Sequence, residues 1–250
     1  FFQDKRAFVF SNAYSPASGT APSVKSILTG KSPSYWGRQN ISKPPPVDEE
    51  TLVSHFLKEG YRTGGFTANS LINGGGFSDD YMKYLALGGY NTIRQSALVS
   101  DLILGREPIS SLAWAEKNSL HKVDGALITK LGLEWVRENL SDNFFLYLHL
   151  MDPHWPYRNL DKTPSEKLSH VDMLSGRVDV NNVDAGLLSE MRSRYLGEIE
   201  YSYEILSTFL KELEAIGVLE DTLVVVLGDH GEEFFEHDKF SHGHDVYQEQ

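Results

Sequence analysis

Two continuous apolar runs dominate the hydropathy pattern of the chain, and each is followed directly by polar residues. Residues 222–227 read Thr-Leu-Val-Val-Val-Leu, and residues 143–150 read Asn-Phe-Phe-Leu-Tyr-Leu-His-Leu. Runs of this kind are typical of strands that are buried on both faces of a sheet. Shorter apolar segments at residues 6–12 and 61–68 have the same β-branched and aromatic character. The pattern therefore predicts strands over all four segments.

Helical periodicity occupies much of the chain between these strands. Residues 21–29 are predicted to form a helix, with Thr20 as its N-cap and Gly30 as its stop signal. Residues 70–90 are rich in glycine and are predicted to form a surface excursion. Further helices are predicted over residues 48–58, 123–139 and 187–216. Strands that alternate with helices form βαβ units, so the predicted fold class is α/β with a parallel sheet.

Length, charge and cysteine content argue against several classes of protein. The chain has 250 residues, which suits one large α/β core, and we expect a single domain. The formal net charge is −12 and no stretch is rich in Lys or Arg, so nucleic acid is not an expected partner. No apolar run is long enough to cross a bilayer. Cysteine is absent, which excludes disulfides, thiolate ligands and thiol nucleophiles. The sequence indicates neither a compartment nor an oligomeric state.

The residues that follow the 222–227 run carry the side chains of a metal site. Asp229 and His230 come almost directly after it, and four histidines lie between positions 230 and 244. An Asp–His pair supplies one hard oxygen and one borderline nitrogen, a combination that suits zinc or manganese. A polar turn is the alternative, since turns also favour Asp and Gly. Turn chemistry does not require four histidines, so we expect Asp229 and His230 to bind a divalent metal.

Other polar side chains are expected at the same edge of the sheet, because the carboxyl ends of parallel strands meet there. They are Thr20 after the first predicted strand, His149 and His154 at the middle one, and Asp229 and His242 after the last. Simple helix capping would explain Thr20 fully if nothing else lay nearby. A metal nearby would instead lower the pKa of its hydroxyl and make it a nucleophile. His149 lies inside an apolar strand, where a hydrogen-bonded core histidine is at least as plausible as a ligand.

Three ordered segments of the chain resemble the sulfatase family of the alkaline phosphatase superfamily. They contain Thr20-Ala21-Pro22-Ser23, Met151-Asp152-Pro153-His154-Trp155-Pro156-Tyr157 and Gly228-Asp229-His230-Gly231-Glu232-Glu233. The resemblance covers nearly the whole chain and implies an alkaline-phosphatase-like fold, with helices on both faces of a mostly parallel central sheet. It also implies a single catalytic domain over residues 1–250. That domain is expected to lack its first strand, which carries an acidic metal ligand, and its C-terminal part.

Two departures from the family pattern change the expected chemistry. Sulfatases of the family carry Cys or Ser, converted to formylglycine, where this chain has Thr20, and Arg four residues later, where it has Val24. The formylglycine route is therefore not expected. Threonine at this position resembles the phosphoethanolamine and glycerol-phosphate transferases of the superfamily, in which a metal-bound Thr forms a covalent phosphoryl intermediate. His242, thirteen residues after Asp229, matches a histidine of those transferases. Lys25 is expected to replace part of the missing Arg charge.

The resemblance implies three overlapping groups of site residues. The metal ligands would be Asp229, His230 and Thr20, the catalytic residues Thr20, His154 and His242, and the other substrate contacts Lys25, His149 and His244. Glu232 and Glu233 would support the metal site or begin a helix. The metal would be zinc or manganese, with calcium and magnesium as alternatives.

The implied reaction is the cleavage or transfer of a phosphoester group, or of a sulfate ester, from an anionic substrate. Sequence alone does not distinguish a hydrolase from a transferase, since that depends on whether water or an alcohol accepts the group. The alternative is a non-catalytic, sulfatase-like protein that binds a metal or an anion. The absent Arg favours this alternative.

Overall fold

A three-stranded parallel sheet forms the centre of the molecule. The computed structural model describes residues 7–73, 75–87, 123–154, 157, 183, 185–243, 245 and 247. In this part of the chain, the strands β1 (Arg62–Thr67), β2 (Lys83–Ala86) and β3 (Phe144–His149) pair in the order β2-β1-β3. Thr67 pairs with both Ala86 and His149, so all three strands end in register. Their carboxyl ends therefore form one edge, as the sequence predicts.

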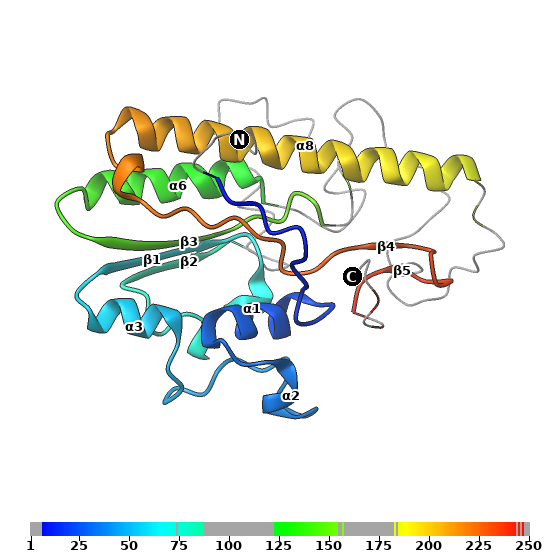
Figure 1. Cartoon of the computed structure of the whole chain (residues 1–250), viewed down its shortest axis with the longest axis horizontal. Helices are drawn as coiled ribbons and strands as arrows, with labels where there is room; N and C mark the ends of the chain where they lie inside the picture. Colours follow the sequence, from blue (N-terminus) through cyan, green and yellow to red (C-terminus); the bar gives the residue numbers. More distant parts are fainter. Residues whose placement is uncertain are drawn as a thin grey trace.

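Helices cover both faces of this sheet, as Figure 1 shows. On one face lie α6 (Gly125–Glu138) and the long α8 (Ala185–Ala215), and on the other lie α1 (Thr20–Thr29) and α3 (Leu52–Lys58). A single turn, α2 (Pro33–Trp36), follows α1. The predicted α/β class with a parallel sheet between helical layers is therefore confirmed. None of the helices in the described residues combines the length and the apolar character that a membrane crossing requires.

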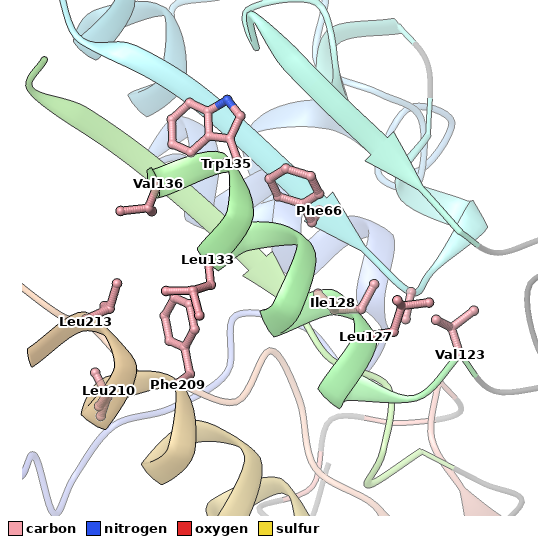
Figure 2. Packing of buried hydrophobic residues seen from close by; sticks show 11 residues of the cluster. Phe66, Val123, Leu127, Ile128, Leu133, Trp135, Val136, Phe209, Leu210 and Leu213 are labelled. Atoms are coloured by element: carbon pink, nitrogen blue, oxygen red, sulfur yellow. The ribbon is translucent and has the colours of Figure 1, made fainter. Parts of the chain in front are cut away.

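Each helical layer buries its own apolar cluster against the sheet. Between β1, α6 and α8, the side chains interlock as drawn in Figure 2: Phe66, Val123, Leu127, Ile128, Leu133, Trp135, Val136, Phe209, Leu210 and Leu213. On the opposite face, the cluster beneath α1 and α3 comprises Val24, Leu28, Val53, Ile72, Phe77 and Tyr81. These two clusters fix α1 and β3 relative to each other. β3 ends, and α1 begins, near the edge that the carboxyl ends of the strands form.

The observed helix boundaries follow their capping residues. Gly19, not Thr20, is the N-cap of α1, and its extended backbone (φ −159°, ψ 151°) leaves Thr20 as the first helical residue. Gly30 ends α1 in the left-handed conformation at φ 67°, as predicted. The helix predicted over residues 48–58 begins only at Leu52, because Thr51 and Ser54 form a reciprocal capping box there.

Two of the four predicted strands are absent from the described residues. Residues 7–12 and 222–227 form no strand, and apolar side chains in both segments are exposed, with Phe8 91 % and Leu223 89 % exposed. These two predictions are wrong because β-propensity does not supply the neighbouring backbone that a ladder of hydrogen bonds requires. A third difference is β2, which lies inside the segment predicted as a surface excursion. That segment also contains the short 3₁₀ turns η1 (Ser70–Ile72) and η2 (Gly75–Phe77).

The tail of the chain forms a small hairpin beyond the sheet edge. After α8 and the 3₁₀ turn η4 (Leu219–Asp221), the strands β4 (Glu233–Phe234) and β5 (Phe240–Ser241) pair antiparallel. Phe235, Asp238 and Ser241 all have positive φ, between 62° and 74°. Such angles are uncommon for residues other than glycine, so the surrounding contacts hold this hairpin in a costly conformation.

Candidate active site

The hydroxyl of Thr20 lies at the N-terminus of α1 and is not used for helix capping. Gly19 occupies the cap position, and no side chain caps the helix. Thr20 is buried, and its Oγ1 lies 3.2 Å from Nε2 of His230. The reading of Thr20 as a simple cap is therefore wrong, since the helix begins one residue earlier than predicted. The hydroxyl is directed instead to an imidazole that comes 210 residues later in the chain.

The tautomer of neutral His230 is set by the backbone carbonyl of the next residue, Gly231. Its Nδ1 lies 2.9 Å from the carbonyl oxygen of Gly231, which can only accept a hydrogen bond. The proton of a neutral ring is therefore on Nδ1, and Nε2 presents its lone pair to the side of Thr20. Asp229 Oδ2 lies 3.6 Å from the same Nε2. A hydroxyl, an imidazole nitrogen and a carboxylate oxygen thus converge from two distant segments.

These three groups fit a divalent cation. Oδ2 of Asp229 is buried and has no hydrogen-bond partner in the described structure, an arrangement that is costly for a carboxylate unless a cation faces it. His230 offers a nitrogen lone pair of the kind that binds zinc or manganese. Among the described residues, no group of three or more His, Asp or Glu side chains is arranged to hold a metal ion. The described donors are therefore one carboxylate, one imidazole and one hydroxyl.

Two further histidines lie beside this group. The ring of His242 lies 4.2 Å from the ring of His230 and 4.9 Å from that of His154, measured between centroids. His242 Nδ1 is 2.5 Å from Oε1 of Glu232, which is itself buried. Burial, the largest single influence, acts to raise the pKa of Glu232, but the hydrogen bonds from His242 and Tyr157 and the electrostatic attraction of His242 and His154 together outweigh it, and the pKa is lowered. The structure thus brings His154, His230 and His242 together.

A pocket of about 680 Å³ opens above these side chains. Its polar lining includes Thr20, His154 and His242, together with Ser18, Ser42 and Asn69. Apolar side chains make up much of the remaining described wall, among them Pro16, Pro22, Pro33, Ile41, Leu71 and Met151. An anionic group that reaches Thr20 would leave the rest of its molecule against this wall.

Two predicted substrate contacts are not brought into the pocket. Lys25 is buried on another side of α1, with Nζ 3.1 Å from the carbonyl oxygen of Asn40 and 3.8 Å from the ring centroid of Trp36. Burial lowers the pKa of this lysine. His149 lies behind the site: its Nδ1 is 3.1 Å from Thr67 Oγ1, and its Nε2 is 3.9 Å from Asp229 Oδ2. His244 lies outside the described residues.

Sequence reasoning missed several polar residues around the site. Ser15 Oγ lies within hydrogen-bond distance of the carbonyl oxygens of Ala17 and Asp229 and can donate its one proton to either, which ties the loop before α1 to the segment that carries Asp229 and His230. Thr67, at the end of β1, contacts His149. The available signal was the carboxyl end of the 61–68 strand, which lies at the same sheet edge. Glu232 contacts His242, and Glu233 belongs to β4, so neither begins a helix.

One protein family and several known proteins are similar to this chain. The family model described as Sulfatase matches residues 2–250. A curated relative, the ulvan-active sulfatase of Formosa agariphila, is 25 % identical over 235 residues, which are 91 % of this chain and 44 % of that protein. This chain therefore spans less than half the length of that relative.

Solved structures share the fold at low sequence identity. The phosphonate monoester hydrolase of Silicibacter pomeroyi has a TM-score of 0.62 and 18 % identity, over 94 % of this chain and 58 % of its own. The lipoteichoic acid synthase LtaP of Listeria monocytogenes has a TM-score of 0.51 and 14 % identity, over 82 % of this chain and 43 % of its own. Because the family model extends over almost every residue, the chain belongs to the sulfatase family, within the alkaline phosphatase superfamily.

Proposed function

We propose that residues 1–250 form a single catalytic domain that transfers a phosphoryl group from an anionic phosphoester to Thr20. The observation that carries this proposal is the position of the Thr20 hydroxyl. It is buried, it is not used by the helix cap, it lines the pocket, and it lies 3.2 Å from His230 Nε2. The N-terminus of α1 favours an incoming anion, because its free N–H groups and the helix dipole point toward the pocket end.

The side chains of the site have distinct roles in this reaction. Thr20 Oγ1 loses its proton to solvent and forms a bond to phosphorus, while the bond from phosphorus to the leaving alcohol oxygen breaks and that oxygen takes a proton from solvent. His154 and His242 donate hydrogen bonds to the non-bridging oxygens, on which negative charge is concentrated. A divalent cation bound by Asp229, His230 and Thr20 would lower the pKa of the hydroxyl and act as a Lewis acid. Water or an alcohol then takes the group from Thr20.

Phosphoesters are favoured over sulfate esters by the nucleophile itself. The chain has no Cys, and Thr stands at the position where sulfatases carry the residue that becomes formylglycine. The fold neighbours named for phosphonate monoester hydrolysis and lipoteichoic acid synthesis are consistent with phosphorus chemistry on this scaffold. Sulfate ester hydrolysis is the second candidate, and its support is the 25 % identity to an ulvan-active sulfatase.

The test uses full-length protein with zinc or manganese and three substrate panels: aryl phosphates, aryl phosphodiesters and aryl sulfates. Thr20→Ala should abolish phosphoester turnover, while Thr20→Ser should retain part of it because the hydroxyl remains. Rapidly quenched wild-type enzyme should carry a phosphoryl adduct on the peptide that contains Thr20. Thr208→Ala is the matched control, since Thr208 is exposed on α8 and its hydroxyl donates to the local carbonyl oxygen of Glu204.

Two results would contradict the proposal. Phosphoester turnover that survives in Thr20→Ala would remove Thr20 from the reaction. Hydrolysis of aryl sulfates with no turnover of either phosphoester panel would assign the site to sulfate esters instead.

A further inference from the structure

A buried carboxylate holds the ring of His242. Oε1 of Glu232 lies 2.5 Å from Nδ1 of His242, and the two side chains are only 4 % and 15 % exposed. A carboxylate can only accept a hydrogen bond, so Nδ1 carries the proton. The other ring nitrogen, Nε2, is on the side of the ring away from Glu232. His242 lines the pocket, and its ring lies next to those of His154 and His230.

The carboxylate is itself fixed from its other side. The hydroxyl of Tyr157 donates to Oε2 of Glu232 at 3.0 Å, and Tyr157 is almost fully buried. Its ring packs against Tyr195 and Phe234, with centroids 5.4 Å and 5.9 Å away. Burial, with the negative charge of Glu232, raises the pKa of Tyr157, so this hydroxyl remains a donor. Among the described residues, each oxygen of Glu232 thus has one hydrogen-bond partner, and neither partner is Thr20, Asp229 or His230.

The backbone around His242 is constrained as well. Ser241 precedes it at φ 74° and Gly243 follows it at φ 82°. The left-handed conformation is costly for Ser241, so contacts on either side must maintain it. The bond between His242 and Glu232 joins the residue after β5 to the residue before β4, at the open end of the hairpin, and is placed to do this. The hairpin therefore presents one imidazole in one orientation.

We propose that Glu232 is a positioning residue of the active site, which holds His242 by its Nδ1–H so that Nε2 faces the transferring group beside Thr20. The proposal rests on the proposed function, since it assigns His242 a substrate oxygen. Tyr157 extends this series of hydrogen bonds beyond Glu232. It also links the series to the segment that carries His154, three residues earlier. A hydrogen bond from a carboxylate to the far nitrogen of a histidine fixes the ring's tautomer and direction.

Kinetics on full-length protein provide the first test, with whichever aryl ester the wild-type enzyme turns over. Glu232→Ala should lower kcat by about tenfold to a hundredfold, with KM within about threefold of wild type. Glu232→Gln should recover much of this loss, because its amide oxygen also accepts from Nδ1–H. In a double-mutant cycle, Glu232→Ala should cost almost nothing further once His242 has been replaced by Ala, because the two act as a unit.

The matched control is Glu236→Gln. Glu236 lies on the same hairpin, between β4 and β5, and its described partners are Arg192 and the backbone N–H of Phe234. Its kcat should remain at the wild-type value. An equal loss of kcat in Glu236→Gln, or additive losses in the cycle, would overturn the proposal and leave a general role in hairpin stability.

Histidine NMR separates this inference from the proposed function, because it requires no turnover. With ¹⁵N-labelled histidine, His242 should show a protonated Nδ1 in wild type and in Glu232→Gln. In Glu232→Ala the signal should change to the Nε2-protonated tautomer that free imidazole prefers. If no ester is turned over but the tautomer changes in this way, the proposed function fails and the positioning role of Glu232 remains. If His242 keeps its tautomer in Glu232→Ala, the positioning role fails, whatever the activity.

Discussion

Two residues of α1 show how the position of a residue along a helix determines which neighbours its side chain contacts. Thr20 and Lys25 are five residues apart, so at about 100° per residue they lie about 140° apart around the helix axis. Thr20 faces the pocket and Lys25 faces Trp36. A charge one position beyond the family's Arg is turned by a further 100° around the axis, and here it lies over Trp36 and does not line the pocket. The motif predicted the place of Thr20, and helix geometry explains why Lys25 contacts a different neighbour.

The contacts of Lys25 predict a structural role. Lys25→Ala removes the cation–π contact with Trp36 and the hydrogen bond to the carbonyl of Asn40. It should lower the free energy of unfolding by about 1–3 kcal/mol, measured by urea denaturation, with kcat within about twofold of wild type. Lys43→Ala is the control, since Lys43 makes an exposed bond to the same residue, Asn40, and should change stability little. A large rise in KM for Lys25→Ala with unchanged stability would restore its predicted substrate contact.

Replacing His154 should have the opposite effect to replacing Lys25: turnover should fall and stability should not. His154 lines the pocket and its ring lies 4.9 Å from that of His242, so its imidazole lies beside the proposed position of the anion. His154→Ala should lower turnover by about a hundredfold, as for the loss of one oxyanion donor, with a melting temperature close to that of wild type. His55→Ala, an exposed histidine on α3, should change neither quantity. A fall in melting temperature with normal turnover would make His154 a structural residue.

At the scale of helices and strands, the sequence correctly predicted the elements whose hydropathy pattern lies within one segment. Both long helices and the strands β1 and β3 lie close to their predicted ranges, because amphipathic periodicity and buried apolar runs are properties of one segment. Residues 222–227 have the strongest strand pattern in the chain and still form no strand in the described structure. β2 has only four residues and follows a glycine-rich stretch, so it was missed. Pairing depends on a neighbouring backbone, which a local pattern does not specify.

The close packing of α6 against the sheet predicts how glycine substitutions should change stability. A Cβ on Gly64 of β1 would lie 2.8 Å from the buried ring of Trp135, so Gly64→Ala should cost about 1–3 kcal/mol of unfolding free energy. Gly197 in α8 has nothing within 4 Å, and Gly197→Ala should stabilise by about 0.5–1 kcal/mol through helix propensity. Chemical denaturation of both variants checks the pair. A stabilised Gly64→Ala would mean that the helix and the sheet are less tightly packed than described.

At the scale of the whole molecule, the site depends on distant parts of the chain meeting at one sheet edge. Thr20 and His230 are separated by 210 residues, and Ser15 and Asp229 by 214. The rule that parallel strands end at a common edge predicted this meeting, even though residues 7–12 and 222–227 are not paired as strands. The rule could not predict the side-chain partners, such as Glu232 for His242. Those depend on loop and hairpin geometry that no periodic pattern encodes.

Because the proposed metal ligands come from both ends of the chain, a bound cation should stabilise the whole fold. A ligand that binds only the folded state at a hundred times its Kd adds about 2.7 kcal/mol to the free energy of unfolding. Full-length protein freed of metal by a chelator should therefore gain several degrees in melting temperature with zinc or manganese, and lose them again when chelator is added. Calcium and magnesium should give smaller shifts, since His230 supplies a nitrogen ligand that these cations bind poorly. The double variant Asp229→Asn, His230→Ala should show no such gain, and elemental analysis should find it without metal. An equal gain in the double variant would place the cation elsewhere and leave Thr20 without its proposed activation.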